Sequence, residues 1–267
     1  LSDRQGSAMI ISSPKGKGHL YELYNNAKHL NDWHSWQYTT EQGGLVAKEE
    51  LEQARQDLDE RTYKQEYQAE FVDYSGVIYY AFSEHNIKEL QFDLGQIPIH
   101  VGIDFNVDPG CAVIGMQHRD GLHIFDELEI WGTDTAEMTR EIQLRYPNRT
   151  VFAYPDASGA QRRTSAGGIT DHIILKNAGF NPAVKDRIAS VNSACKSIDG
   201  KTKLTVHPKC KKVINALRKH TYKEGSRQPE KDTGLDHFCD AVGYLVNNVY
   251  PVRVDVINTY RNISRSV

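Results

Sequence analysis

The chain is poor in cysteine, and its four cysteines stand far apart in the sequence without forming a Cys-x-x-Cys pair. This spacing argues against a zinc site or a disulfide framework and favours a reducing compartment. Long apolar runs are also missing, since none approaches the ~20 residues that cross a bilayer. The opening stretch LSDRQGSAMIISS has no basic region followed by an apolar core, so it lacks the pattern of a signal peptide. We therefore expect no membrane contact.

No GxGxxG segment follows a predicted strand, which argues against a small-molecule dehydrogenase. A large charge imbalance is absent as well: 32 Lys and Arg stand against 35 Asp and Glu, giving a formal net charge of −3. Any surface for nucleic acid must then be a local patch. With 267 residues, of which 39% are apolar, the chain is long enough to bury a substantial core.

The first part of the chain has the pattern of short elements joined by loops. We expect an apolar strand at 8–11, then a turn and a short helix in SSPKGKGHLYELY, then an aromatic-rich loop. Residues 46–71 are dense in strong helix formers and contain no Gly or Pro, so they predict one helix. Residues 72–97 are expected to be a loose connection.

From Pro98 onward the strand and helix patterns alternate. PIHVGIDF, CAVIGM and LHIFDELEI predict three strands joined by turns, which together form an antiparallel meander. TDTAEMTREIQLRY predicts an amphipathic helix, and TVFAYP predicts a fourth, buried strand. Further helices are expected from about Thr170, at 189–198 and at 208–222, with short strands at NPAVK and KLTVH. LDHFCDAVGYLVNNVY predicts the last helix, which ends before Pro251.

This order of elements predicts where two carboxylates meet. A crossover helix between the third and fourth strands is right-handed, which places the fourth strand parallel to the first and beside it. The first strand ends at Asp104 and the fourth ends on Asp156, so both acids are expected at the same edge of the sheet, where ligand sites collect. Either residue alone also fits a turn or a helix cap, but the pair favours a metal site.

The last helix adds further acids. Asp236 and Asp240 are four residues apart and share one helical face, while apolar residues occupy most of the other. Asp236 also fits the role of an acid that stabilises the helix N-terminus. His237 fits a proton shuttle or a phosphate contact, but equally a partly exposed helix histidine. The third strand carries Asp126, Glu127 and Glu129, which alternate between its two faces. Either the acids on one face, Glu127 among them, reach the site, or all of them face solvent.

Carboxylates without a Cys or His cluster beside them are ligands suited to Mg²⁺ or Mn²⁺. Two such ions about 3.5–4 Å apart can activate water and stabilise the leaving oxygen in phosphodiester cleavage. Between positions 196 and 231, eleven Lys or Arg stand against three acids, an excess that suits phosphate unless it is only a solvated face. The cations expected to contact DNA are Arg162, Arg163, Lys209, Lys211, Lys212, Arg218 and Lys219.

Several of these segments resemble the large terminase subunit of tailed bacteriophages. GIDFNVDPG, YPDASG and LDHFCDAVGYL are similar to motifs of its C-terminal nuclease domain. That domain has a ribonuclease H-like α/β fold, a mixed sheet of an antiparallel three-strand meander plus parallel strands, flanked by helices. The resemblance implies that Asp104, Asp156 and Asp240 are the acidic metal ligands. MIISSPKGKGHLYELY resembles the motif that follows the ATPase core, and KQEYQAEF with VIYYAF resembles the connection between the two halves.

One part of the family pattern is missing, the phosphate-binding GxxxxGK[ST] loop, so this chain alone cannot be a complete ATPase. We expect residues 1–71 to be the C-terminal remnant of an ATPase domain and 72–97 to be a linker. Residues 98–250 would then form the nuclease domain, and 251–267 a C-terminal tail. The full-length protein is expected to be an ATPase as well.

The resulting hypothesis is an endonuclease that uses two Mg²⁺ or Mn²⁺ ions to cut concatemeric double-stranded viral DNA in the host cytoplasm. Its expected partners are the small terminase subunit, which would choose the site, and the portal protein. A non-enzymatic alternative is a motor module that grips DNA or docks on the portal without cutting. A resolvase or transposase of the same superfamily is a further alternative, although neither would need the SSPKGKGHLYELY stretch.

Overall fold

The computed structural model describes the chain in several stretches. They comprise residues 6–14, 19–72, 76–95, 97–106, 108–119, 121–155, 187–224, 226 and 228–252. Asp156, Arg162 and Arg163 lie outside the described residues, as do the helix expected from about Thr170 and the strand expected at NPAVK.

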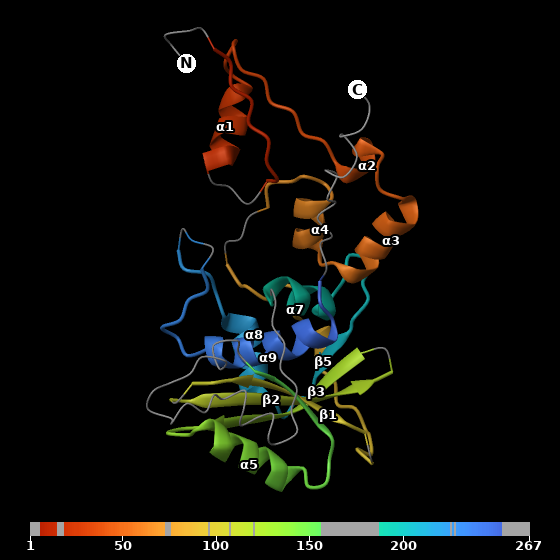
Figure 1. Ribbon diagram of the computed structural model, residues 1–267, viewed down its shortest axis with the longest axis vertical. Coiled ribbons are helices and arrows are strands. Elements are labelled where there is room, and N and C mark those ends of the chain that lie inside the picture. The colour runs from red at the N-terminus through yellow and green to blue at the C-terminus, as the bar shows by residue number, and fades with distance from the viewer. Residues whose placement is uncertain are drawn as a thin grey trace, which may run out of the picture.

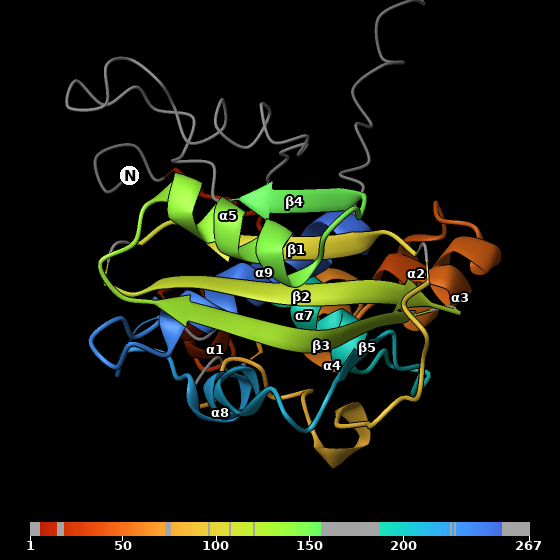
Figure 2. The ribbon, with the colours of Figure 1, turned by 90° about the horizontal axis from the view of Figure 1, so that it is seen from below.

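Five strands form one mixed sheet in the order β4-β1-β2-β3-β5 (Figure 2). The strands are β1 Ile99–Asp104, β2 Gly110–His118, β3 Gly121–Ile130, β4 Val151–Pro155 and β5 Leu204–Val206. The first three make an antiparallel meander, while β4 pairs in parallel with β1, and β5 with β3. The predicted meander, the return of the fourth strand beside the first and the strand in KLTVH are therefore confirmed.

Helices cover both faces of this sheet (Figures 1 and 2). One face carries α5 (Thr135–Arg145), whose Met138 and Ile142 are buried against β1 and β2. The other face carries α7 (Ile188–Cys195), α8 (Lys211–Lys219) and α9 (Asp236–Val249). Because β1 is buried on both faces, it is apolar almost throughout, as a strand covered by two helical layers must be. No described helix is both long and apolar enough to span a membrane.

The last helix crosses β1 with the two backbones in contact. A Cβ atom on Gly102 would lie 2.0 Å from the carbonyl oxygen of Ala241 and 2.9 Å from the Cβ of Leu245. Only a residue without a side chain allows this approach. The crossing therefore brings the first two turns of α9 beside the C-terminal end of β1.

Among the described residues before the sheet, the chain forms four helices and one 3₁₀ turn, and Figure 1 labels the helices. They are α1 His19–Ala27, α2 Thr40–Gly43, α3 Lys48–Asp57, α4 Glu60–Glu66 and the 3₁₀ turn η2 Glu84–Asn86. The short helix expected after SSPKGKG is thus present as α1. The strand expected at 8–11 is not formed: these residues are exposed and pair with no strand among the described residues. An isolated apolar segment gains nothing from extended structure without a neighbouring strand.

The single helix predicted over 46–71 is two helices, α3 and α4, because the helical backbone is interrupted at Leu58 and Asp59. The carboxylate of Asp59 caps α4 by accepting from the backbone N–H groups of Arg61 and Thr62. It also accepts from the hydroxyls of Tyr80 and Ser193, which belong to later parts of the chain. Asp59 is only 2% exposed. Its hydrogen bonds to distant residues outweigh the helix propensity of the surrounding sequence.

Several described residues between α4 and β1 are packed into the core, where the sequence predicted a loose connection. Ile78 and Tyr79 are buried in the core under α8 and α9. Asn86 is buried and donates from its amide to the carbonyl oxygens of Cys195 and Leu204, both at 2.9 Å. The expected domain boundaries stay a prediction, but residues 78–82 and Asn86 are packed with the core.

Candidate metal centre

Three acids lie near one another where β1 ends and α9 begins. Asp104 is the last residue of β1, and Asp236 and Asp240 stand on the first two turns of α9. The side chains of Asp104 and Asp236 are only 13% and 12% exposed. Burial raises the pKa of Asp240 to about 6, and the charges of Asp104 and Asp236 act in the same direction, against the opposing effect of the Arg187 guanidinium. The sequence predicted Asp104, Asp156 and Asp240 as the ligands and Asp236 as an auxiliary residue, and Asp156 lies outside the described residues.

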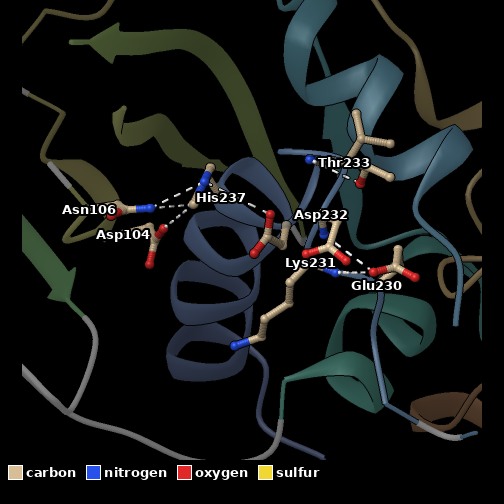
Figure 3. A network of polar contacts seen from close by, with 9 residues as sticks. Asp104, Asn106, Glu230, Lys231, Asp232, Thr233 and His237 are labelled. Carbon is tan, nitrogen blue, oxygen red and sulfur yellow. Dashed lines mark hydrogen bonds and ion pairs between the residues drawn. The ribbon is translucent and has the colours of Figure 1, made fainter. Parts of the chain in front are cut away.

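His237 joins the two elements that carry these acids. Its Nδ1 atom lies 3.0 Å from Oδ2 of Asp104, and its Nε2 atom lies 3.9 Å from Oδ1 of Asp236. The amide nitrogen of Asn106 lies 3.2 Å from the imidazole nitrogens, so the side chains of Asp104, Asn106 and His237 point toward one another (Figure 3). The hydrogen bond to Asp104 raises the pKa of His237. The imidazole therefore holds the Asp104 carboxylate in place.

One carboxylate oxygen in this group is buried without a donor. Oδ1 of Asp236 accepts no hydrogen bond from any described residue. A buried carboxylate oxygen left without a partner costs free energy, of order 1–3 kcal/mol or more. Carboxylate oxygens are also the ligands that Mg²⁺ and Mn²⁺ prefer. The chemistry of the donors and the orphaned oxygen both fit a divalent cation here.

The described residues give only part of a metal site. Among them, no three His, Cys, Asp or Glu side chains are arranged to hold a metal together. The third expected ligand, Asp156, is not among the described residues. The parallel register of β1 and β4 pairs Ile103 with Pro155, each one residue before an expected ligand. The four cysteines are free and buried.

Glu127 has a structural role instead of reaching the acids. Its two oxygens accept the backbone N–H groups of Lys212 at 3.0 Å and Val213 at 2.8 Å, so it caps the N-terminus of α8. Burial raises its pKa. The carboxylate is thus committed to the helix, and we do not propose Glu127 as a ligand. The acid of β3 that lies in the row of Asp104 is Glu129, through the pairings Asp104–Cys111 and Cys111–Glu129.

Arg187 is a member of this site that no pattern in the sequence indicated. It precedes α7, and its Nη1 atom lies 3.2 Å from Oδ1 of Asp240. Its guanidinium also lies over the ring of Tyr244, at 4.3 Å from the centroid. Asn106 was likewise not predicted, although it follows Asp104 by two residues on the same turn.

The basic residues expected on α8 divide into two groups. Lys212 pairs with Glu129, Arg218 with Glu84, and Lys209 lies 3.9 Å from a carboxylate oxygen of Asp126. Lys211 and Lys219 have no ion-pair partner among the described residues. With Arg218 they line a groove of about 460 Å³ along α8, completed by Ile87, Pro208, Ile214 and Asn215. Since Glu129 stands two strands from Asp104, Lys212 reaches a point about 10 Å across the sheet from it.

The strand order and the acids at the end of β1 and on the last helix define a ribonuclease H-like domain. A family model described as the terminase RNaseH-like domain matches residues 101–249 of the chain. This match spans more than half of the sequence, and the chain belongs to that family. The resemblance drawn from GIDFNVDPG, YPDASG and LDHFCDAVGYL is thereby confirmed, together with the fold class.

Two individual proteins extend the likeness beyond the nuclease fold. The large terminase subunit of Escherichia phage T5 is 24% identical over 270 residues, covering 93% of this chain and 60% of that protein. The large terminase of a thermophilic bacteriophage shares 14% identity and a TM-score of 0.68, covering 89% of this chain and 60% of that one. The same thermophilic-phage protein in complex with ADP gives a TM-score of 0.68 at 15% identity, covering 89% of this chain and 61% of that one. This structural likeness concerns the fold, and the chain spans about 60% of the length of these relatives.

Proposed function

We propose that this chain is the nuclease-bearing portion of a large terminase subunit and cuts concatemeric double-stranded DNA by metal-dependent phosphodiester hydrolysis. The observation that carries the proposal is the position of Asp104 beside the first two turns of α9, fixed by the backbone contact at Gly102. Membership of the terminase RNaseH-like domain family supports it. So does the likeness to the thermophilic-phage terminase, which extends the match upstream of the nuclease domain.

The residues that would hold the ions are Asp104, Asp240 and Asp156. Bound Mg²⁺ or Mn²⁺ would supply activation of the attacking water and stabilisation of the leaving oxygen. The pairing of Ile103 with Pro155 supports the inclusion of Asp156, the next residue in sequence after Pro155. Asp236 lies near enough to Asp240 to affect its pKa and stays an auxiliary candidate.

The other groups at the site position these acids. His237 bonds to Oδ2 of Asp104 and so fixes the rotation of that carboxylate, and Asn106 holds the imidazole in turn. Partners of metal ligands usually orient the ligand and tune its basicity in this way. His237 is also the group in the site best suited to move a proton, since its Nδ1 already lies 3.0 Å from an acid.

DNA would lie along the edge of the sheet that carries Asp104, toward α8. Lys212 pairs with Glu129, whose backbone lies two strands from Asp104, about 10 Å across the sheet and so roughly three base steps on one strand. Lys211, Lys219 and Arg218 extend the positive charge further along α8. We include Arg162 and Arg163 in the interface on the strength of the sequence alone.

The full-length protein would also be an ATPase and would act in the host cytoplasm. The small terminase subunit would direct the cut, and the portal protein would receive the DNA. These proposals follow from the terminase family, because base-reading motifs are absent from the sequence and cut-site choice then falls to a partner.

Metal-dependent nicking of supercoiled plasmid tests the nuclease proposal. Millimolar Mg²⁺ or Mn²⁺ should support nicking, EDTA should stop it, and Zn²⁺ should support it poorly. Asp240→Asn should abolish nicking, whereas Asp199→Asn, which removes an exposed acid between α7 and β5, should not. Nicking that survives EDTA would overturn the two-metal mechanism. DNA binding without nicking in either metal would favour the motor-module alternative.

A further inference from the structure

Arg187 is built into the face of α9 that carries Asp240. Its stem lies over Gly243, where an added Cβ would come within 2.9 Å of the Cβ of Arg187 and 3.2 Å of its Cδ. Its guanidinium lies 4.3 Å from the centroid of the Tyr244 ring, and its Nη1 reaches Oδ1 of Asp240 at 3.2 Å. Asp240, Gly243 and Tyr244 are spaced i, i+3 and i+4, so one stripe of the helix forms the seat of this side chain.

The charges around Arg187 put it in competition with any cation that binds Asp240. Asp104 and Asp236 also act on Asp240, so three acidic side chains share a partly buried region. In that region Arg187 supplies a permanent positive charge at one oxygen of Asp240. A divalent ion bound to Asp240 would meet this guanidinium as a like charge a few ångströms away, and the two would contend for the same carboxylate.

We propose that Arg187 is a positioning residue that competes with the divalent metal for Asp240: it holds the carboxylate when no metal is bound and lowers the affinity of the site for the ion. The proposal rests on the proposed function, since it takes Asp240 as a metal ligand. The guanidinium lies over the Tyr244 ring while it contacts Asp240, so the ring would still hold it in place once the carboxylate binds a metal.

Metal affinity distinguishes this role from that of a structural ion pair. Arg187→Met keeps an apolar stem over Gly243 and Tyr244 and removes the charge, and Arg187→Gln removes the charge with a polar side chain. Both should bind Mn²⁺ about three- to tenfold more tightly than the original chain, because a like charge beside the ion is gone. Arg187→Lys keeps the charge and should stay within about twofold. Titration calorimetry with Mn²⁺ measures all of these affinities directly.

Arg61 provides a matched control. It also stacks on a tyrosine, with its guanidinium carbon 3.9 Å from the centroid of the Tyr80 ring, but it lies on α4. Arg61→Gln should leave the Mn²⁺ affinity unchanged. In thermal unfolding, Arg187→Met should lower the melting temperature in EDTA, and saturating Mn²⁺ should remove most of that difference.

Two results would overturn the inference, and they separate it from the nuclease proposal. If the original chain binds Mn²⁺ and nicks DNA but the Met and Gln variants bind Mn²⁺ no more tightly, Arg187 is a structural partner and the nuclease proposal stands. An equal loss of melting temperature in EDTA and in Mn²⁺ would say the same. If the original chain binds no Mn²⁺, both proposals fall together.

Discussion

The Nδ1 atom of His237 lies 3.0 Å from Oδ2 of Asp104, and this hydrogen bond ties the first turn of α9 to the last residue of β1. Both side chains are largely buried, with 16% and 13% of their surface exposed. A bond in this position restricts the rotation of a carboxylate that is proposed to be a metal ligand. The histidine therefore matters to the site even if it never contacts DNA.

Removing His237 should weaken the site without dismantling the fold. His237→Ala is expected to reduce plasmid nicking by roughly 10- to 100-fold and to raise the Mn²⁺ concentration needed for half-maximal activity, as loss of a ligand's partner usually does. His85→Ala, at an exposed histidine of η2, is the control and should behave like the original chain. Full activity of His237→Ala would reduce the histidine to a helix-surface residue.

Asp104→Asn should separate a metal ligand from a structural acid. The variant keeps the shape of the side chain but removes one of the mutually repelling charges, so its melting temperature in EDTA should be equal to or higher than that of the original chain. Nicking should be abolished, and Mn²⁺ should no longer raise the melting temperature as strongly. A structural acid would instead cost about 1 kcal/mol when lost. Retained nicking would end the assignment of Asp104.

Lys211 and Lys219, which have no ion-pair partner in the part of the chain that the structure describes, should contribute to DNA binding for all sequences alike. Reversing Lys211 and Lys219 to Glu should weaken duplex binding and flatten the dependence of log affinity on log salt by roughly one for each lost phosphate contact. Reversing Lys28 and Lys48, which lie on the N-terminal segment, changes the net charge equally and serves as the control. If both pairs give the same affinity and slope, the positive charge of α8 is only a solvated face.

Acid should destabilise the fold through His123. Burial lowers its pKa to about 4, with His207 and His118 acting in the same direction, and only 1% of the residue is exposed. The unfolded chain binds this proton near pH 6.5, so the stabilisation is complete above that pH and is lost as the pH falls toward 4. Between about pH 7 and about pH 5 the free energy of unfolding should fall by about 2 kcal/mol from this group.

Urea unfolding at the two pH values measures that loss. His123→Gln should flatten the decrease, whereas His85→Gln, at an exposed position, should leave it unchanged. A pH dependence that is identical in all three proteins would place the acid sensitivity elsewhere, for example in His220, whose pKa is also lowered by burial.

Asp59 should be the most costly polar residue of the N-terminal segment to remove. It caps α4 and accepts hydrogen bonds from the hydroxyls of Tyr80 and Ser193. Asp59→Ala should lower the free energy of unfolding by about 2–4 kcal/mol, since several buried donors lose their acceptor at once. Thr39→Ala removes the cap of the exposed helix α2 and should cost only about 0.5–1 kcal/mol. Equal losses in a denaturant titration would contradict the proposed role of Asp59.

The sheet was predictable because its signals are local or follow from chain handedness. Apolar runs with turn residues between them indicated β1, β2 and β3, and the right-handed crossover placed β4 beside β1. The same reasoning placed Asp104 at the C-terminal end of β1, next to the end of β4. The break at Asp59 was not predictable, because a helix-forming stretch shows no sign of the distant hydroxyls that compete for it.

The charged partners of the site were beyond sequence reasoning for a related reason. Arg187 contacts Asp240, a residue far from it along the chain, and only the seat formed by Gly243 and Tyr244 identifies it. Glu127 and Glu129 share one strand face, so periodicity alone could not assign one to the helix cap and the other to the row of Asp104. Such choices depend on where α8 begins, which the pattern fixes only to within a few residues.

At the contact between Gly102 and Ala241, β1 and α9 cross with their backbones touching and no side chain between them. Elsewhere in a core, a change of one methyl group can be absorbed by neighbouring rotamers, but here the only adjustable parts are two main chains. The distance between the backbones that carry Asp104 and Asp240 is therefore fixed by this contact. Any accommodation of one ion or two has to come from rotation of the carboxylates themselves, which is the freedom that His237 and Arg187 restrain.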